Sequence, residues 1–211
     1  FMSIRSRISI IIPYYRKKKY FQETIKSILN QTYKNYEVIV IYDDTSLDEL
    51  EFVISNLNKI KNKKLIINNK NYGVGFSRNR GISQARGTYI AFCDADDVWK
   101  KNKLYSQLKF MFKNDLEISY TNYFIINEKS KIIGKFKSLK KLNYKDLLKS
   151  CDIGLSTIIL NKKFFNKNKF SELKTKEDYL LWLKIAKKIK FIYGLNQYLS
   201  SWIENNNSLS S

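Results

Sequence analysis

A chain of 211 residues, 44% of them hydrophobic and 15% aromatic, is long enough for one α/β domain with its own core and is neither disordered nor fibrous. The absence of histidine excludes a Ser-His-Asp or Cys-His catalytic arrangement and a His-ligated zinc site. No apolar run approaches the roughly 20 residues of a membrane-spanning helix, so we expect a soluble cytoplasmic protein.

The formal net charge of +20 favours an anionic partner, either nucleic acid or a membrane surface. Residues 101–211 carry 22 lysines, no arginine and 9 acidic residues. This lysine-rich half is the one that we expect to rest peripherally on the anionic inner face of the cytoplasmic membrane. A solvated basic surface, produced by the coding bias of an AT-rich genome, explains the same composition.

The first residue and the two cysteines bear on the covalent structure of the chain. Phe1 precedes Met2, and we predict that Phe1 is left over from an expression vector. Cys93 and Cys151 have neither the spacing of a disulfide framework nor that of a metal knuckle. We expect both to be reduced, buried side chains.

The first predicted strand, residues 8–13, is rich in β-branched side chains and is closed by Pro13, the only proline. Tyr14, Tyr15 and Arg16 leave its carboxyl end. Apolar residues at helical spacing then predict a helix over residues 20–30.

The second predicted strand, residues 37–42, ends in Asp43 and Asp44. Ligands of open α/β sheets lie beyond the carboxyl ends of the strands, which favours a binding role for this pair. The alternative is that one of the acids only supports the turn into the next helix. Ser46 and Glu49 predict that helix as a capping box.

A short third strand over residues 64–68 leads into a glycine-containing turn and a third helix start near Gly73. Free N–H groups at such a helix start attract anions, and Arg78 and Arg80 add positive charge. The first strand lacks the glycine-rich turn of a dinucleotide-binding fold, which argues against NAD.

The strand that follows, residues 89–93, is apolar on both alternating faces and is predicted to be a central strand. It ends in Asp94, Asp96 and Asp97. Residues i and i+2 of an extended segment point the same way, so Asp94 and Asp96 can face one target, and a divalent cation would relieve their repulsion. The alternative is a turn or a cap for the helix that ends near residue 113.

The second half is predicted to add antiparallel strands at a sheet edge, over residues 118–127 and 132–136. A short helix over 144–150, an apolar strand over 155–160, and strands over 191–193 and 198–203 complete this half.

A helix is expected to open at Glu177 and Asp178, with Tyr179, Trp182 and neighbouring apolar residues on one stripe. Thr175 and Asp178 match a capping box, and two acids in a first turn complement the helix dipole. That dipole is expected to lower the pKa of Asp178.

Taken together, these motifs resemble the family 2 glycosyltransferases, nucleotide-sugar enzymes with a GT-A type, Rossmann-like fold. The likeness covers nearly the whole chain. The motifs that carry it are Ser9–Tyr15, Ser27–Tyr33, Asp43-Asp44, Ser77–Ile82, Asp94–Asp97 and Glu177-Asp178.

The resemblance implies a mostly parallel central sheet flanked by helices, in a single domain over residues 2–211. Residues 2–99 would form the nucleotide-sugar-binding half and residues 100–211 the acceptor-side half. The sites that it implies are the nucleotide (Pro13, Tyr15, Asp44 and Arg78), the ribose (Asp94), the metal (Asp96), the general base (Asp178) and the acceptor side (Glu177 and Trp182).

The implied reaction is transfer of a sugar from a nucleotide sugar, most simply a UDP-sugar, to a hydroxyl of a bacterial surface glycan or glycolipid. Mn²⁺ or Mg²⁺ would neutralise the leaving diphosphate, and one base on the opposite face would give inversion. Many relatives place a histidine near the end of the catalytic region, where this chain has Trp202–Glu204 before Asn207.

Two other functions compete with this one. The first is a basic nucleic-acid-binding module, but no aromatic residues interleave a basic stripe and the acids occupy the expected crevice, so we expect no nucleic acid partner. The second is a homologue that binds a nucleotide sugar without transferring it.

Overall fold

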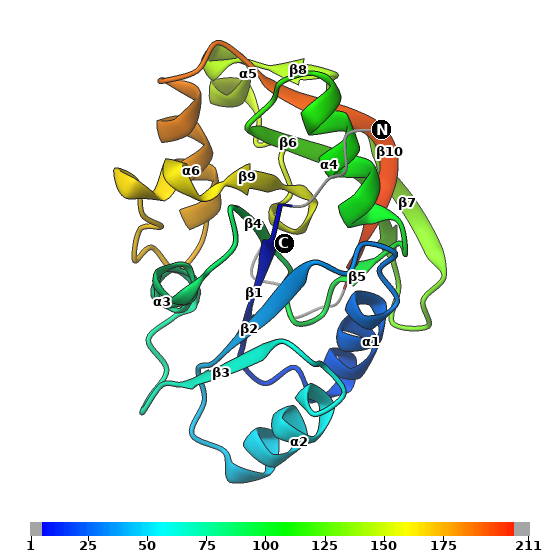
Figure 1. Ribbon diagram of the computed structural model, residues 1–211, viewed down its shortest axis with the longest axis vertical. Helices are drawn as coiled ribbons and strands as arrows, with labels where there is room; N and C mark the ends of the chain where they lie inside the picture. The colour runs from blue at the N-terminus through cyan, green and yellow to red at the C-terminus, as the bar shows by residue number, and fades with distance from the viewer. Residues whose placement is uncertain (1–5, 205–211) are drawn as a thin grey trace.

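Ten strands of the described residues, 6–204, form one mixed sheet in the computed structural model (Figure 1). The strand order is β3-β2-β1-β4-β9-β6-β10-β5, with β7 beside β6 and β8 beside β10. The strands are β1 (Ile8–Tyr14), β2 (Tyr36–Tyr42), β3 (Lys63–Ile67), β4 (Tyr89–Phe92), β5 (Val98–Trp99), β6 (Ile118–Ile126), β7 (Ile132–Phe136), β8 (Lys141–Leu142), β9 (Ile159–Asn161) and β10 (Ile192–Ile203).

Six α-helices and two 3₁₀ turns accompany the sheet within the same described range. The helices are α1 (Lys18–Leu29), α2 (Leu47–Leu57), α3 (Val74–Gln84), α4 (Lys103–Lys113), α5 (Tyr144–Lys149) and α6 (Glu177–Ala186), and the 3₁₀ turns are η1 (Leu155–Thr157) and η2 (Lys162–Asn166). Phe1 and the tail over 205–211 lie outside the described residues, and what was expected of them remains a prediction.

Strands β1 to β4 pair in parallel, as their apolar runs predict. Successive side chains of a strand point to opposite faces, so β1 contributes to two cores: Ile10 lies in the cluster with α1, α2 and α4, and Ile11 lies in the cluster with α3 and α6. Both isoleucines are fully buried, and each such burial stabilises the fold by roughly 1.5–3 kcal/mol. The result is the predicted α/β architecture, with helices on both faces of the sheet.

Helix α3 lies close to the sheet because Gly81 carries no side chain. A Cβ at Gly81 would lie 2.7 Å from Ile11 Cγ2 and 2.8 Å from Ile41 Cδ1. The start of α2 follows the predicted cap, since Ser46 Oγ accepts a hydrogen bond from the Glu49 amide.

The second half of the sheet differs from the prediction in three places. β6 is not an edge strand, because it pairs with β9 on one side and β10 on the other. The two strands expected after residue 190 are one strand, β10, whose pairing with β6 is interrupted between Leu195 and Ser200. Half of the strand expected over 155–160 is the 3₁₀ turn η1.

Two local predictions are also wrong. α6 begins without the Thr175 capping box: its N-cap is Lys176, in the left-handed conformation at φ 61°, with no side-chain cap. Cys151 is exposed, whereas Cys93 is buried as expected. Of the two structural roles that competed with a catalytic one, the capping box is therefore absent, while Glu177 and Asp178 do lie in the first turn of α6.

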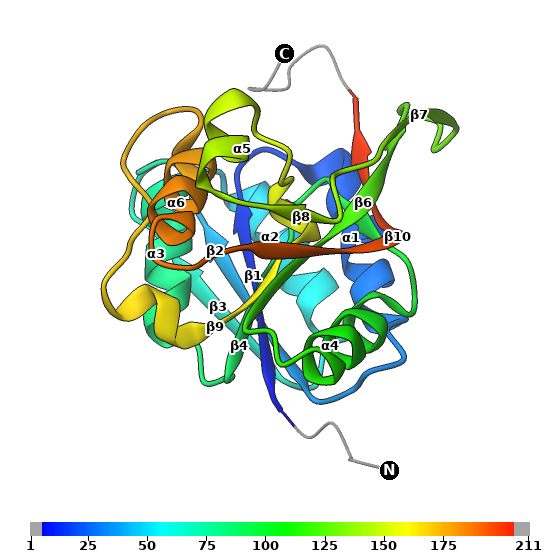
Figure 2. The ribbon, with the colours of Figure 1, turned by 90° about the horizontal axis from the view of Figure 1, so that it is seen from above.

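Strands from both halves of the chain share the sheet. β4 pairs with β9, and β5 pairs with β10 near the C-terminus. Figure 2, which looks down on the end formed by α5, β8 and α6, shows these C-terminal elements stacked over the N-terminal strands. Among residues 6–204, no helix has the length and apolar character needed to cross a bilayer.

Candidate active site

Three parallel strands deliver the predicted site residues to one edge of the sheet. The register pairs Tyr14 with Tyr42 in β1 and β2, and Ile11 with Phe92 in β1 and β4. The segments that follow these strands, residues 15–17, 43–44 and 94–97, therefore emerge side by side.

Asp43 and Asp44 have different environments. Asp43 is structural, because its carboxylate accepts hydrogen bonds from the amides of Tyr72 and Gly73, both at 2.9 Å, and from the Asn68 side chain. Asp44 Oδ1 accepts from the Thr45 amide at 2.7 Å, but its buried Oδ2 has no hydrogen-bond partner. A buried carboxylate oxygen without a donor is expected to receive one from a ligand.

The end of β1 supplies an aromatic and a cationic side chain to the same place. Tyr15 is 43% exposed, and the Arg16 guanidinium lies 5.1 Å from its ring centre. Arg16 Nε also lies 3.8 Å from Asp44 Oδ2. Arg16 has φ 49°, a left-handed conformation that is strained for a side chain of this size. Pro13, within β1 and two residues before Tyr15, is half-buried.

The 94–97 segment is a tight turn braced from two sides. The Asp97 amide donates to Asp94 O and the Asp94 amide donates to Ser156 Oγ, both at 3.0 Å. Thr24, on α1, donates from its hydroxyl to Ala95 O at 3.0 Å. The alternative of a helix cap is excluded, because α4 begins only at residue 103.

This turn concentrates negative charge in a buried place. Burial raises the pKa of Asp97 well above its usual range, and the charges of Asp94 and Asp96 raise it further. Burial also raises the pKa of Asp96, although the ammonium of Lys17 opposes that shift. Lys17 Nζ lies 2.5 Å from Asp96 Oδ2 and supplies a positive charge at this carboxylate.

Arg78, on α3, joins this turn to α6. Its Nη2 donates to Asp94 Oδ1 at 2.8 Å and its Nη1 donates to Glu177 Oε1. The Arg78 side chain is 4% exposed, and the two carboxylates keep the pKa of the guanidinium raised against the effect of burial. The predicted donor-pocket arginine is therefore a buried bridge between the aspartate turn, residues 94–97, and Glu177, the residue before the predicted base.

Asp178 follows Glu177 at the start of α6, and its Oδ1 accepts a hydrogen bond from the Tyr179 amide at 2.8 Å. Burial raises the pKa of Asp178, and the Glu177 charge adds to the shift, while Arg78 opposes it. The direction is opposite to the one predicted from the helix dipole, because desolvation outweighs the favourable interactions. A higher pKa makes Asp178 a stronger base.

The two residues expected on the acceptor side are both buried. Glu177 is 5% exposed and paired with Arg78, so it holds the start of α6 in place. Trp182 is fully buried and packs edge-on against Phe170. The assignment of Trp182 to the acceptor side is wrong, since its position on the apolar stripe of α6 is a core position.

Sequence reasoning missed Lys17 and Ser156. Asp44 and Asp94 were predicted as site residues because they follow the carboxyl ends of strands. Lys17 follows the carboxyl end of β1, so the same criterion could have identified it. Ser156 lies far from the aspartates in sequence, in a segment predicted as strand, and no local pattern connects it with them.

The aspartate turn fits a divalent cation, because Asp94 and Asp96 offer oxygen ligands and their charge is only partly compensated. Among residues 6–204, no group of three or more Asp, Glu or Cys side chains is gathered for a metal ion. One or two carboxylates suffice for Mg²⁺ when substrate phosphates and water complete the coordination. A surface hollow of about 370 Å³ lies elsewhere, beside Ile67 and Arg80, and no carboxylate lines it.

The comparison with protein families decides the class of the molecule. Residues 9–174 match the model of "Glycosyl transferase family 2". The chain belongs to glycosyl transferase family 2. The resemblance inferred from the motifs is thus confirmed, and this family 2 glycosyltransferase carries its aspartate turn, Arg78 bridge and Glu177-Asp178 pair within or just beyond the matched region.

Two curated proteins show how far the likeness extends. TuaG of Bacillus subtilis, described as a putative teichuronic acid biosynthesis glycosyltransferase, is 32% identical over 97% of this chain and 81% of its own length. WfgD of Escherichia coli, a UDP-Glc:alpha-D-GlcNAc-diphosphoundecaprenol beta-1,3-glucosyltransferase, is 41% identical over 85% of this chain and 70% of its own length.

Among solved structures, Staphylococcus aureus TarS 1–349 in complex with UDP-GlcNAc superposes with a TM-score of 0.81 at 22% identity. The match covers 96% of this chain and 60% of that chain. It confirms the GT-A type fold of this family 2 glycosyltransferase.

Proposed function

We propose that the protein is an inverting glycosyltransferase that moves a sugar from a UDP-sugar to a hydroxyl of a lipid-linked bacterial surface glycan. The observation that carries the proposal is the Arg78 bridge. One guanidinium contacts Asp94, on the donor side, and Glu177, beside the base Asp178. Donor and base residues therefore border one region rather than separate surfaces.

The nucleotide is assigned to the ends of β1 and β2. Asp44 Oδ2, which is buried and lacks a hydrogen-bond donor, would accept from an N–H of the base, and Tyr15, two residues after Pro13, would offer its exposed ring. The UDP-GlcNAc complex of TarS, with the same fold, supports a uracil nucleotide as the donor part.

Mn²⁺ or Mg²⁺ would be held by Asp96, with Asp94 toward the ribose, and would supply charge neutralisation for the departing diphosphate. Lys17 already contacts Asp96 and Arg16 lies one residue before it, so both cations border the place where phosphate oxygens would lie. These side chains would exchange their carboxylate partners for phosphate oxygens as the donor binds.

Asp178 is the proposed general base. As the acceptor hydroxyl oxygen forms the bond to the anomeric carbon, its proton passes to Asp178, and the bond to the diphosphate oxygen breaks on the opposite face. A single displacement of this kind inverts the anomeric configuration. The raised pKa of Asp178 suits a group that must accept a proton.

The acceptor class rests on the relatives. WfgD is named for transfer to a GlcNAc linked to diphosphoundecaprenol and TuaG for teichuronic acid biosynthesis, both bacterial envelope glycans. At 41% and 32% identity, these names support a lipid-linked or polymeric surface glycan as the acceptor.

Thermal unfolding with UDP and Mn²⁺ tests the donor half of the proposal. At about 100 times the dissociation constant, linkage stabilises the fold by roughly 2.7 kcal/mol, a rise in Tm of several degrees for a chain of this size. Asp96→Asn is expected to lose the metal-dependent part of the rise. No shift with UDP, GDP or CMP in the presence of Mn²⁺ would contradict donor binding.

Asp178→Asn tests the catalytic half. The amide cannot take the proton, so transfer is expected to fall by about 10²–10⁴-fold while the UDP-dependent shift in Tm is kept. Transfer that persists at the wild-type rate removes Asp178 from the role of base. Donor binding without transfer by the wild-type chain would instead identify an inactive homologue.

A further inference from the structure

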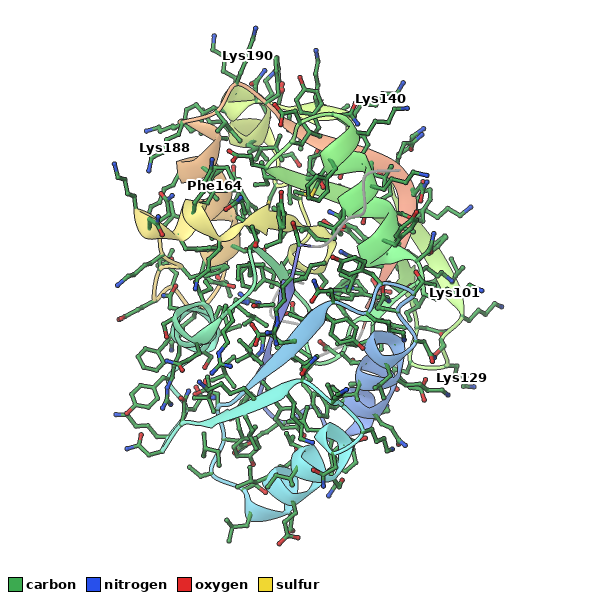
Figure 3. The ribbon with its side chains drawn as sticks, in the orientation of Figure 1. Lys101, Lys129, Lys140, Phe164, Lys188 and Lys190 are labelled. Carbon is green, nitrogen blue, oxygen red and sulfur yellow. The ribbon has the colours of Figure 1, made fainter. Side chains whose placement is uncertain are left out.

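One end of the molecule gathers unpaired positive charge. The segments 137–150 and 183–195 contain nine lysines and a single acid, Asp146. Asp146 is engaged in the cap of α5, where its carboxylate accepts from the Asn143 amide at 3.0 Å. Figure 3 shows Lys140, Lys188 and Lys190 at the end of the molecule where α5, β8 and the end of α6 lie.

The lysines of this end differ from several other lysines of the chain because they form no ion pairs with carboxylates among the described residues. Lys17, Lys19 and Lys163 each lie within ion-pair distance of a carboxylate. In the described part of the chain, no carboxylate forms an ion pair with any lysine of the two segments. Lys187 and Lys190 instead lie against the rings of Tyr144 and Phe191.

Large apolar side chains are exposed among these lysines. Leu139 is 57% exposed, Leu148 is 54% exposed and Tyr193 is 36% exposed. Leu139 lies just before β8, Leu148 lies in α5 and Tyr193 lies in β10. β8 pairs with β10, and α5 packs on α6. We name this surface the basic end, defined by Lys140, Lys145, Lys149, Lys187, Lys188 and Lys190 with the three apolar side chains.

The basic end borders the acceptor side of the proposed active site. Tyr179, next to Asp178, donates from its hydroxyl to Leu147 O at 2.5 Å, so α5 is fixed beside the start of α6. The Asp178 charge contributes to the raised pKa of Cys151, just beyond the end of α5. Leu148 and Lys149, which follow Leu147 in α5, therefore belong to the part of the basic end that is held beside the start of α6.

We propose that the basic end is the surface by which the protein docks on an anionic lipid bilayer. Each lysine near a negatively charged leaflet contributes to binding, and exposed leucine and tyrosine side chains enter the headgroup region. The inference rests on the proposed function in one respect: docking there would bring Asp178 toward an acceptor whose lipid stays in the membrane.

The mixture of side chains favours a bilayer over nucleic acid. Single-stranded nucleic acids bind to aromatic platforms beside a basic groove, and duplexes bind to bases and phosphates through polar and cationic groups. Exposed leucines contribute to neither mode. They do match an interface that is anionic at its surface and apolar just below it.

Co-sedimentation with vesicles tests the proposal. The wild-type chain is expected to sediment with phosphatidylcholine vesicles containing phosphatidylglycerol, and not with phosphatidylcholine alone, and high salt should release it. The combined substitution Lys140→Ser, Lys145→Ser, Lys149→Ser and Lys190→Ser is expected to lower the partition coefficient by about tenfold or more.

A matched variant controls for total charge. Lys59→Ser, Lys61→Ser, Lys63→Ser and Lys70→Ser removes the same number of exposed lysines near α2 and β3, and it should bind vesicles like the wild type. Leu139→Ser with Leu148→Ser keeps every charge and is still expected to weaken binding. Equal losses in the two lysine variants, or no sedimentation of the wild type, would overturn the proposal.

Two further measurements separate the outcomes. The UDP-dependent shift in Tm is measured on all variants and should be unchanged, so a chain that binds vesicles but not UDP keeps this inference while the proposed function fails. A fluorescent RNA is titrated in parallel. RNA binding that the basic-end variant loses, with no vesicle binding by the wild type, assigns the surface to nucleic acid.

Discussion

Buried ionisable side chains determine what the site can do at the scale of single residues. Arg78 is surrounded by protein, yet it stays charged because Asp94 and Glu177 lie on two of its nitrogens. Removing one member of such a group leaves an unpaired buried charge, which typically costs about 3–5 kcal/mol. Arg78 thus holds the aspartate turn and Glu177, the residue before the proposed base Asp178, in fixed positions relative to each other.

The pH dependence of transfer follows from the burial of Asp178. A general base must be deprotonated. An ordinary aspartate loses its deprotonated form at about pH 4, and the raised pKa of Asp178 means that Asp178 loses it at a higher pH. We expect the acid limb of kcat against pH to lie above that value. Glu177→Gln should move this limb to lower pH, because it removes a neighbouring negative charge.

A pH–rate profile of the wild type and Glu177→Gln checks this expectation. Unchanged circular dichroism and an unchanged UDP-dependent shift in Tm at each pH serve as controls, since Glu177 also contacts Arg78. An acid limb at the position of an unperturbed aspartate would show that Asp178 is solvated during turnover.

At the scale of elements, α3 and the segment before α6 are held together closely. Asn79 accepts from the Phe170 amide and donates to Phe170 O, both at 2.9 Å. Gly75 makes the approach possible, because a Cβ there would overlap Ser171 O. The start of α6, and with it Asp178, is therefore positioned by α3.

Gly75→Ala is expected to push the 171–176 segment away and to lower kcat, while the dissociation constant for UDP changes little. Overpacking of this kind costs about 1–3 kcal/mol, so Tm should fall by several degrees. Gly134→Ala on β7, where a Cβ would lie 3.3 Å from Ile125 Cδ1, is the matched control. Equal effects of the two substitutions on kcat would contradict the role of Gly75.

Elements with a strong local signal were predictable from the sequence. The parallel strands β1, β2 and β4 are apolar on both faces, and the Ser46 cap fixes the start of α2. η1 was not predictable, because it opens the otherwise apolar run 155–160 and its 3₁₀ turn depends on contacts of Ser156 with Trp99 and the aspartate turn. The start of α6 also depends on tertiary contacts, since Arg78 holds Glu177 where no capping side chain acts.

In the site, too, local sequence signals could be predicted and the effects of tertiary packing could not. The aspartates could be placed because strand ends in a parallel sheet share one edge. The burial that raises the pKa of Asp178, and the core position of Trp182, come from the packing of α6 on Phe170 and α5, which the sequence of α6 alone does not reveal.

For the molecule as a whole, the sheet joins the two predicted halves. The cut between residues 99 and 100 would separate β4 from β9 and β5 from β10. We expect one cooperative thermal transition, with equal calorimetric and van't Hoff enthalpies. Residues 100–211 expressed alone are expected to lack a sharp transition, and two separated transitions in the intact chain would contradict a single domain.

The lack of histidine has a practical consequence in combination with the buried ionisable groups. Burial lowers the pKa of Lys103 to about 7, and it raises the pKa values of the Asp97 and Asp178 carboxyls above those of ordinary aspartates. Proton uptake or release on donor binding, measured by titration calorimetry in buffers of different ionisation enthalpy, would therefore report on these few interior groups without an imidazole background.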